Sequence, residues 1–384
     1  MNPLESSGKP LFFKLDDASK AAFAPQLNRK GAAVRTWVRS LSAMQKEAIV
    51  TSAGTGTAWR LASDEGPYLM GDDVAPCPLA FFTTGMVSSF MDQILSSARE
   101  RSIRVRDIRL TQDNFYTMTG SFHRGTIKGG ALPVALMVEV DCDAESSALT
   151  QAVNEALGAS PVTGLLHAEM NSRFTLTHNG REIATGQVES IGRAPEPAAL
   201  DQFDGTEPAA GNWSALVARA GTTPQTDENT SSVGSSLADE QNRQLHLRGI
   251  CTLRADGVKK IEQHLYNPRG SIFHFLSDKA SDCAPDAAAY MSAGLGFCFM
   301  TQFGRYAKIM KMNLREYSIV QDTHFFAGGA DPVETHVYLA TDADDSAART
   351  ALDVSERTCF LHALCRTKLD TKAEISRIRT ASIP

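Results

Sequence analysis

The sequence predicts an α+β fold that is built twice from one unit, because a long apolar segment and the strand patterns around it recur along the chain. Residues 75–93 read APCPLAFFTTGMVSSFMDQ, and residues 284–302 read APDAAAYMSAGLGFCFMTQ. Both segments carry a glycine at the same place, Gly85 and Gly294, and both end in Phe-Met-x-Gln. A chain of 384 residues also exceeds one ordinary core, which indicates two domains plus connecting material.

Each half begins with short segments that are rich in β-branched and aromatic residues and separated by glycine. This pattern is typical of strands joined by hairpins. These segments are 33–42, 46–54 and 56–63 in the first half, and 249–257, 259–267 and 270–278 in the second. Later alternating patterns predict further strands at 103–110, 134–142, 314–322 and 335–343.

The long apolar segment lies between the two groups of strands. It predicts a helix from Pro76 to about Arg99, and another from Pro285 to about Lys308. Proline is well tolerated at a helix start, and a helix that is apolar nearly all round is a buried one. A shorter helical pattern follows in each half, at 147–162 and 346–361.

The stretch between the halves is rich in Pro, Gly, Ser, Thr and Asp and has little apolar surface to bury. It is therefore expected to be a flexible linker, at residues 194–244. The expected domains are 1–193 and 245–384.

Composition excludes several functions. The net charge is −6 and the basic residues are dispersed, so no nucleic-acid partner is expected. The N-terminus MNPLESSGKP lacks a signal pattern, and no apolar run approaches the ~20 residues of a membrane span, so we expect a cytoplasmic protein without a membrane partner. The seven cysteines show no metal-ligand spacing, and no phosphate-binding loop is present, so neither a metal nor a cofactor is expected.

Two cysteines distinguish the halves. Cys298, within the second apolar segment, matches Ser89 of the first, and Cys359 matches Ser160. A buried thiol has a raised pKa and is inert unless a cation or a hydrogen-bond donor stabilises its thiolate. A reactive Cys298 therefore requires a charged or imidazole neighbour.

Three stretches resemble the OsmC/Ohr family. Residues 63–82, SDEGPYLMGDDVAPCPLAFF, look like the region that leads into the central helix of that family, while SAGLGFC at 292–298 and ERTCF at 356–360 resemble its two cysteine sites. The resemblance implies two OsmC-like domains in tandem, with both cysteines kept only in the second. It further implies an intramolecular pseudo-dimer whose strands wrap around central buried helices. Whether the fused chain pairs again as a homodimer stays open.

The resemblance also implies a reaction. Cys298 would attack an organic hydroperoxide as a thiolate, and Cys359 would resolve the sulfenic acid to a disulfide that an external dithiol reduces. The family usually places a Glu in the first turns of the central helix, where it holds an Arg over the thiolate, but this chain has Ala288 and Ala289 there, with only Asp286 nearby. The candidates for the arginine are Arg35, Arg39, Arg248 and Arg254.

Histidines offer a second route to activation. His274 and His324 occur only in the half with the thiols, and His362 lies three residues beyond Cys359. A Cys–His pair would suit a hydrolase that acts on a carbonyl substrate, at a C–C or acyl bond. A third hypothesis, from another class, is a non-catalytic protein that binds an apolar small molecule between the halves.

Overall fold

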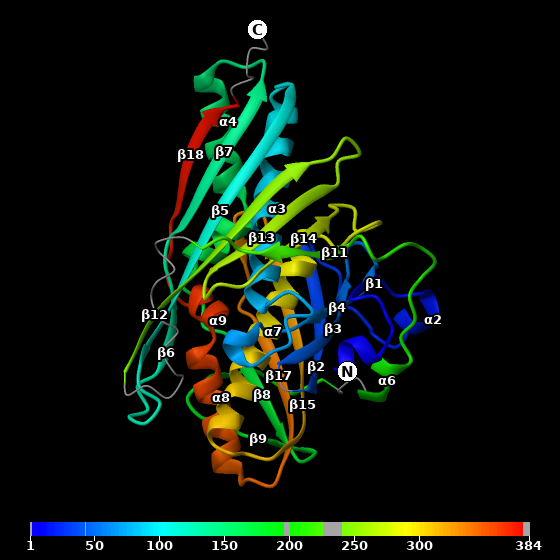
Figure 1. Cartoon of the computed structure of the whole chain (residues 1–384), viewed down its shortest axis with the longest axis vertical. Helices are drawn as coiled ribbons and strands as arrows, with labels where there is room; N and C mark the ends of the chain where they lie inside the picture. Colours follow the sequence, from blue (N-terminus) through cyan, green and yellow to red (C-terminus); the bar gives the residue numbers. More distant parts are fainter. Residues whose placement is uncertain (1, 43, 196–199, 226–239, 379–384) are drawn as a thin grey trace.

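Two long buried helices, α3 (Pro78–Glu100) and α7 (Ala287–Ile309), pack against each other at the centre of the computed structural model (Figure 1). The structure describes residues 2–42, 44–195, 200–225 and 240–378. Both helices begin and end within two residues of their predicted bounds. Their apolar composition is explained by burial on nearly every face, so this prediction is confirmed.

The two repeated glycines lie where these helices cross. A Cβ atom at Gly85 would lie 2.5 Å from the Met291 Cγ atom and 2.6 Å from the Ala287 carbonyl oxygen. A Cβ atom at Gly294 would lie 2.8 Å from the backbone nitrogen of Phe82. Each helix therefore approaches the other through its own glycine, and neither position has room for a larger side chain.

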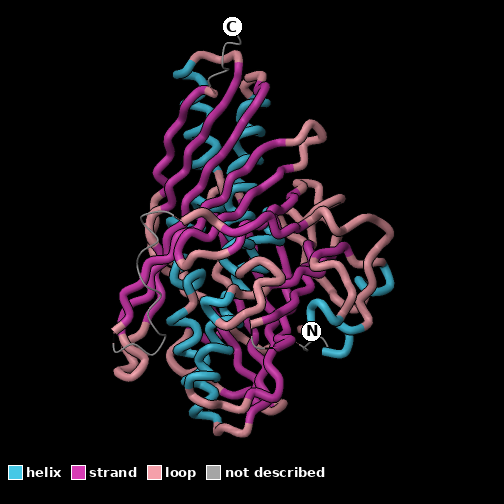
Figure 2. Tube along the Cα trace, in the orientation of Figure 1, coloured by secondary structure: helices cyan, strands magenta, loops and turns pink. Residues whose placement is uncertain are grey.

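The strands in the described part of the chain form two sheets, which Figure 2 shows wrapped around the helices. The first sheet has ten strands, in the order β1 (Phe12–Lys14), β4 (Ala58–Ser63), β3 (Gln45–Ser52), β2 (Ala32–Ser42), β15 (Leu314–Phe326), β17 (Glu334–Thr341), β8 (Arg173–His178) and β10 (Glu189–Ser190), with β16 (Gly329–Ala330) on β15 and β9 (Arg181–Ile183) on β8. The second has eight, in the order β11 (Val217–Thr222), β14 (Ser271–Ser277), β13 (Lys259–Asn267), β12 (Gln241–Leu253), β5 (Val105–Gly120), β7 (Val134–Cys142) and β18 (Thr371–Arg377), with β6 (Lys128–Ala131) on β5.

Both sheets contain strands from both halves of the sequence. In the first sheet β2 pairs with β15, and in the second β12 pairs with β5. Helix α7 packs on the first sheet and α3 on the second, so the layers run sheet, helix, helix, sheet. The mixed α+β class is confirmed, and each predicted strand segment overlaps a strand, although the segment at 249–257 runs past the end of β12 at Leu253.

The shorter helical pattern of each half is two helices rather than one. In the first half α4 (Ser146–Ala159) is followed by α5 (Pro161–His167), and in the second α8 (Asp345–Thr358) is followed by α9 (Phe360–Cys365). Ser160 and Cys359 each occupy the extended residue between the two helices. Ser160 and Cys359, which match in sequence, therefore occupy equivalent positions in the two halves.

The described part of the expected linker, residues 194–244, contains regular secondary structure. It contains α6 (Leu200–Asp204), and β11 pairs with β14 across a full strand length. Strand β12 already begins at Gln241. Residues 196–199 and 226–239 of the expected linker lie outside the described residues.

Three short helical turns complete the described secondary structure: α1 (Pro3–Ser6), α2 (Asp17–Lys20) and η1 (Pro67–Leu69). Of these, η1 lies between β4 and α3, in a stretch that has no counterpart in the second half. Among the described helices, none combines the length and the apolar character that crossing a membrane requires.

Candidate active site

The two sequence-predicted thiols lie next to each other. Cys298 is in the middle of α7 and Cys359 is the residue between α8 and α9, and the structure places their sulfur atoms 3.3 Å apart, with the Cys359 thiol donating to the Cys298 sulfur. Both side chains are buried. A disulfide bond is ~2.05 Å long, so the sulfurs need to approach by only about 1.3 Å to form one.

Burial alone would keep Cys298 protonated. It raises the pKa of this thiol well above its ordinary value, and the neighbouring Cys359 raises it further. The backbone N–H of Leu361, in the first turn of α9, acts in the opposite direction by hydrogen bonding to the sulfur. A thiolate at Cys298 therefore depends on additional positive charge.

Three charged side chains supply the electrostatic environment of Cys298: the buried Lys46 on β3, the buried Glu65 two residues after β4, and the partly buried Arg305 on α7. The Lys46 Nζ donates to the carbonyl oxygen of Met44 at 2.9 Å, and the Tyr68 hydroxyl donates to Glu65 at 2.8 Å. Charge interactions join Glu65 and Cys298 to both Lys46 and Arg305. Two of the three residues, Lys46 and Glu65, come from the half that lacks the thiols.

These groups shift each other's protonation. Burial raises the pKa of Glu65 to about 7, although Lys46, Tyr68 and Arg305 pull it down. Burial lowers the pKa of Lys46 to about 8 and that of Arg305 to about 10, and both shifts are opposed by Glu65 and by Cys298. The cluster therefore titrates near neutral pH while the guanidinium stays charged.

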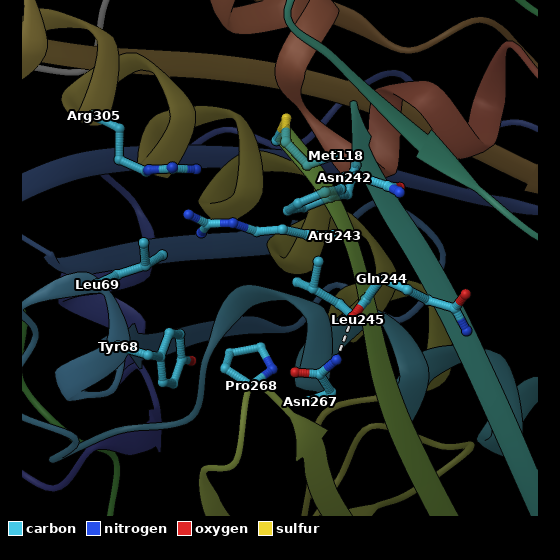
Figure 3. Close-up of a pocket in the computed structure, with 11 residues that line it drawn as sticks. Tyr68, Leu69, Met118, Asn242, Arg243, Gln244, Leu245, Asn267, Pro268 and Arg305 are labelled. Atoms are coloured by element: carbon cyan, nitrogen blue, oxygen red, sulfur yellow. Dashed lines mark hydrogen bonds between the residues drawn. The ribbon is translucent and has the colours of Figure 1, made fainter. Parts of the chain in front are cut away.

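Two adjoining pockets lie beside the thiol. The inner pocket is small, about 30 Å³, and Cys298, Glu65, Cys77 and Gln302 are among the residues that line it. An outer pocket of about 80 Å³ shares part of its walls, formed by Tyr68, Leu69, Leu245, Pro268 and Phe360. Figure 3 shows the guanidinium groups of Arg243 and Arg305 in this outer pocket. The walls are largely apolar, and two cations lie at the pocket.

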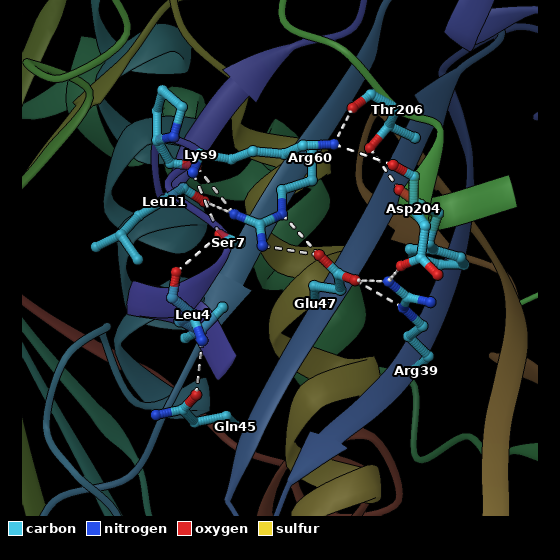
Figure 4. A network of polar contacts seen from close by, with 12 residues as sticks. Leu4, Ser7, Lys9, Leu11, Arg39, Gln45, Glu47, Arg60, Asp204 and Thr206 are labelled. Atoms are coloured by element: carbon cyan, nitrogen blue, oxygen red, sulfur yellow. Dashed lines mark hydrogen bonds and ion pairs between the residues drawn. The ribbon is translucent and has the colours of Figure 1, made fainter. Parts of the chain in front are cut away.

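None of the four predicted arginines activates the thiol, because each is bound elsewhere. Arg35 binds Asp322, Arg248 binds Asp113 and Arg254 binds Asp256. Arg39, on β2, donates to Glu47 on β3 and to Asp204, and Figure 4 shows this network. The structure therefore corrects this expectation and places Arg305 near Cys298 instead.

The predicted histidines are not at the thiols either. His324 contacts Asp331 through Nδ1 at 2.9 Å and the Lys30 carbonyl oxygen through Nε2 at 2.8 Å. His274 is partly exposed, on β14, with Glu262 at 3.8 Å. Neither lines the cavity of Cys298.

His362 is likewise unsuited to act as a base. It is packed between the rings of Phe174 and Phe299, and burial lowers its pKa to about 3. The Cys–His arrangement behind the hydrolase hypothesis is therefore not formed among the described residues.

Two features of the sequence point to site residues that were not predicted. Thr301, Gln302 and Arg305 lie three, four and seven residues beyond Cys298, which is the spacing of one helix face. Glu65 directly precedes the insertion present only in the first half, and Tyr68 lies within it. These two signals point to Arg305 and Glu65, whereas no sequence signal points to Lys46 on β3.

The corresponding place in the first half has a different chemistry. Ser89 and Ser160 replace the thiols, and both hydroxyls are buried. Lys259 on β13, the counterpart of Lys46, donates to Asp92 at 2.7 Å. In this half the buried ammonium already has a carboxylate partner.

In comparisons with known proteins, a family model matches part of the second half of the chain. Residues 278–374, which include α7 and both cysteines, match the sequence model of a family described as OsmC-like protein. Among solved structures, an OsmC-like hydroperoxide resistance protein from Jannaschia sp. CCS1 is similar at 19% sequence identity, over 34% of this chain and 81% of that chain, with a TM-score of 0.20. No curated protein matches the chain.

Proposed function

Because residues 278–374 belong to the OsmC-like protein family, we propose that this chain reduces organic hydroperoxides with Cys298 and Cys359. The observation that carries the proposal is the 3.3 Å separation of the two buried sulfurs. Such a pair can accept one oxygen atom and then close a disulfide before the first sulfur is oxidised further. The apolar walls of the outer pocket suit the organic group of the peroxide.

The reaction has three steps. The Cys298 thiolate attacks the terminal peroxide oxygen, the O–O bond breaks, and the alkoxide leaves and takes up a proton to become an alcohol. The Cys359 sulfur then attacks the Cys298 sulfenic acid, which forms the disulfide and releases water. Finally, an external dithiol supplies two electrons and two protons and restores both thiols.

The charged cluster is proposed to activate the first step. Arg305 and Lys46 place positive charge near a sulfur that burial otherwise keeps protonated. Glu65 would hold these cations in place, as the Glu of the family does from the first turns of the central helix. Here that role would pass from the second half, with Ala288 and Ala289, to a residue of the first half.

We further propose that the first half is a second OsmC-like unit and acts as an internal partner subunit. Arg35 and Asp322 lie directly opposite each other on β2 and β15, and Arg248 and Asp113 lie opposite each other on β12 and β5. Both are two-pronged ion pairs between the halves. The reciprocal pairing supports a pseudo-dimer, with the domains 1–193 and 245–384 exchanging strands.

The experiment is mass spectrometry of the full chain after one equivalent of cumene hydroperoxide, without reduction. We expect a Cys298–Cys359 disulfide and one equivalent of cumyl alcohol. In the Cys359→Ser variant, we expect a Cys298 sulfenic acid that dimedone traps. Cys365→Ser is the matched control, because this buried thiol lies on the same short helix and should leave the disulfide unchanged.

Two outcomes would contradict the proposal. One is that both thiols stay reduced while the peroxide is consumed or ignored. The other is full turnover by the Cys359→Ser variant with no reductant requirement, which would indicate chemistry on Cys298 alone.

A further inference from the structure

A second cluster of potential ligands lies on the first sheet, away from the thiols. Asp322 on β15 is directly opposite Glu334 on β17, and His336 is two residues further along β17. One ligand atom from each of the three side chains lies within 4.8 Å of the other two. Two oxygen donors and one imidazole nitrogen are thus gathered at a single point on two neighbouring strands.

The cluster faces away from the central helices. Gln321 and Thr323, the residues on either side of Asp322, both hydrogen bond to Ser292 of α7. Side chains alternate along a strand, so Asp322 lies on the opposite face of the sheet. The cluster is therefore independent of the thiol site and of the function proposed for it.

The imidazole of His336 is arranged as a metal ligand would be. Its Nδ1 is 2.8 Å from the Thr175 hydroxyl on β8, and its Nε2 has no hydrogen-bond partner among residues 2–42, 44–195, 200–225 and 240–378. The side chain is only 5% exposed. A histidine whose other ring nitrogen is fixed by a neighbour is the usual form of a metal-binding imidazole.

Only one of the two carboxylates at the cluster has an ion pair among the described residues. Arg35 binds both oxygens of Asp322 at 2.7 Å, yet each carboxylate oxygen has a second lone pair available for a metal. Glu334 has no ion pair within 4 Å in the described part of the chain. Burial and the nearby Asp322 raise the pKa of Glu334, while Arg173 and Arg29 oppose this at longer range.

The first half provides an internal comparison. There the equivalent ion pair, Asp113 with Arg248, is present, but the residues that face Asp113 along β7 are Ala135 and, two positions on, Met137. In this half Asp113 is bound by Arg248 and by His246 of β12, whose Nε2 lies 2.6 Å from an Asp113 oxygen, and no second carboxylate is present on β7 beside it. The second carboxylate and the β17 imidazole are additions specific to the second half.

From this geometry we propose that Asp322, Glu334 and His336 bind a divalent first-row transition metal ion. Mixed oxygen and imidazole donors suit Zn²⁺, Co²⁺, Mn²⁺ or Fe²⁺, and three protein ligands leave a position for water. No metal is expected from the sequence, because the ligands come from two strands and form no Cys/His motif.

The test is titration of the metal-free full chain with Co²⁺, followed by absorption spectroscopy and by metal analysis after dialysis. We expect one Co²⁺ per chain at this site, visible d–d bands without a sulfur-to-cobalt charge-transfer band, and a Tm that rises with Co²⁺ concentration. Glu334→Gln and His336→Gln should each weaken binding by more than about ten-fold. His246→Gln, next to the ion pair of the other half, is the control and should bind Co²⁺ as the unmodified chain does.

Three outcomes would overturn the proposal: no stoichiometric Co²⁺, binding that survives both substitutions, or a charge-transfer band that assigns the metal to the cysteines. Circular dichroism and the Tm of the metal-free variants separate loss of a ligand from loss of the fold. Glu334→Gln keeps the size of the side chain and removes only its charge, so a folded variant is the expected case.

Discussion

The buried carboxyl of Glu65 provides a quantitative prediction. Burial raises its pKa from 4.5 to about 7, so the folded state binds a proton more tightly than the unfolded state does. Stability then falls as the pH rises from about 4.5 to 7, and the loss is complete above pH 7. A shift of about 2.5 units corresponds to ~3 kcal/mol.

The substitution Glu65→Gln removes this titration while keeping the shape of the side chain. We expect the variant and the unmodified chain to have similar stability at pH 5, and the variant to be more stable at pH 8 by up to ~3 kcal/mol. Lys46 does not cancel this difference in stability. Its pKa is about 8 in the unmodified chain and falls further without Glu65, so its buried positive charge is neutralised at a lower pH. The same variant should reduce hydroperoxide more slowly, since Arg305 and Lys46 lose their carboxylate.

The assay is urea denaturation at pH 5 and pH 8, followed by the fluorescence of the tryptophans, with peroxide consumption measured on the same samples. Glu240→Gln is the control, because this carboxylate is exposed and pairs with the exposed Arg124. Its profile should follow that of the unmodified chain. Parallel pH profiles for the Glu65 variant and the unmodified chain would refute the reasoning.

Three further predictions concern other parts of the molecule. Arg305→Met should lower kcat/KM for cumene hydroperoxide by ~100-fold in steady-state assays while the chain stays folded, because a charge that acts on the reacting sulfur is lost; an unchanged rate would exclude Arg305 from activation. Gly85→Ala should lower stability by ~2 kcal/mol because of the close helix crossing, whereas Gly158→Ala, a helical site with open space around it, should raise it by up to ~1 kcal/mol in thermal denaturation. Arg35→Met and Arg248→Met should each cost ~2 kcal/mol in the same measurement, and a much smaller loss would show that these pairs do not tie the halves together.

Much of the fold could be predicted from the sequence because its signals are local. The apolar pattern of α3 and α7 and the alternation of the strands depend on residues close together in the chain. The match of Cys359 to Ser160 also needed only the repeat, and the structure places both residues between two short helices. The bounds of α3 and α7 were accurate to two residues for the same reason, whereas the break within each shorter helical pattern was not predicted.

The charged part of the site could not be predicted because it is assembled across the halves. Lys46 and Glu65 come near Cys298 only when α7 packs on β2 and β3, more than 230 residues away in sequence. The choice of arginine depended on which guanidinium groups already had carboxylate partners, and that depends on cross-strand register, for instance Arg35 opposite Asp322. Residue types and spacing do not contain this information.

The sulfur atoms and the charged groups beside them come from different halves of the chain, which constrains how the sequence can change. A deletion that spared every residue of the carboxyl-terminal half would keep both cysteines, yet it would remove the lysine and the glutamate beside them. Conversely, the amino-terminal half has no thiol at the matching place and could not compensate for loss of the other. Neither half could replace the other, so selection on the proposed peroxide reduction would act on the two together.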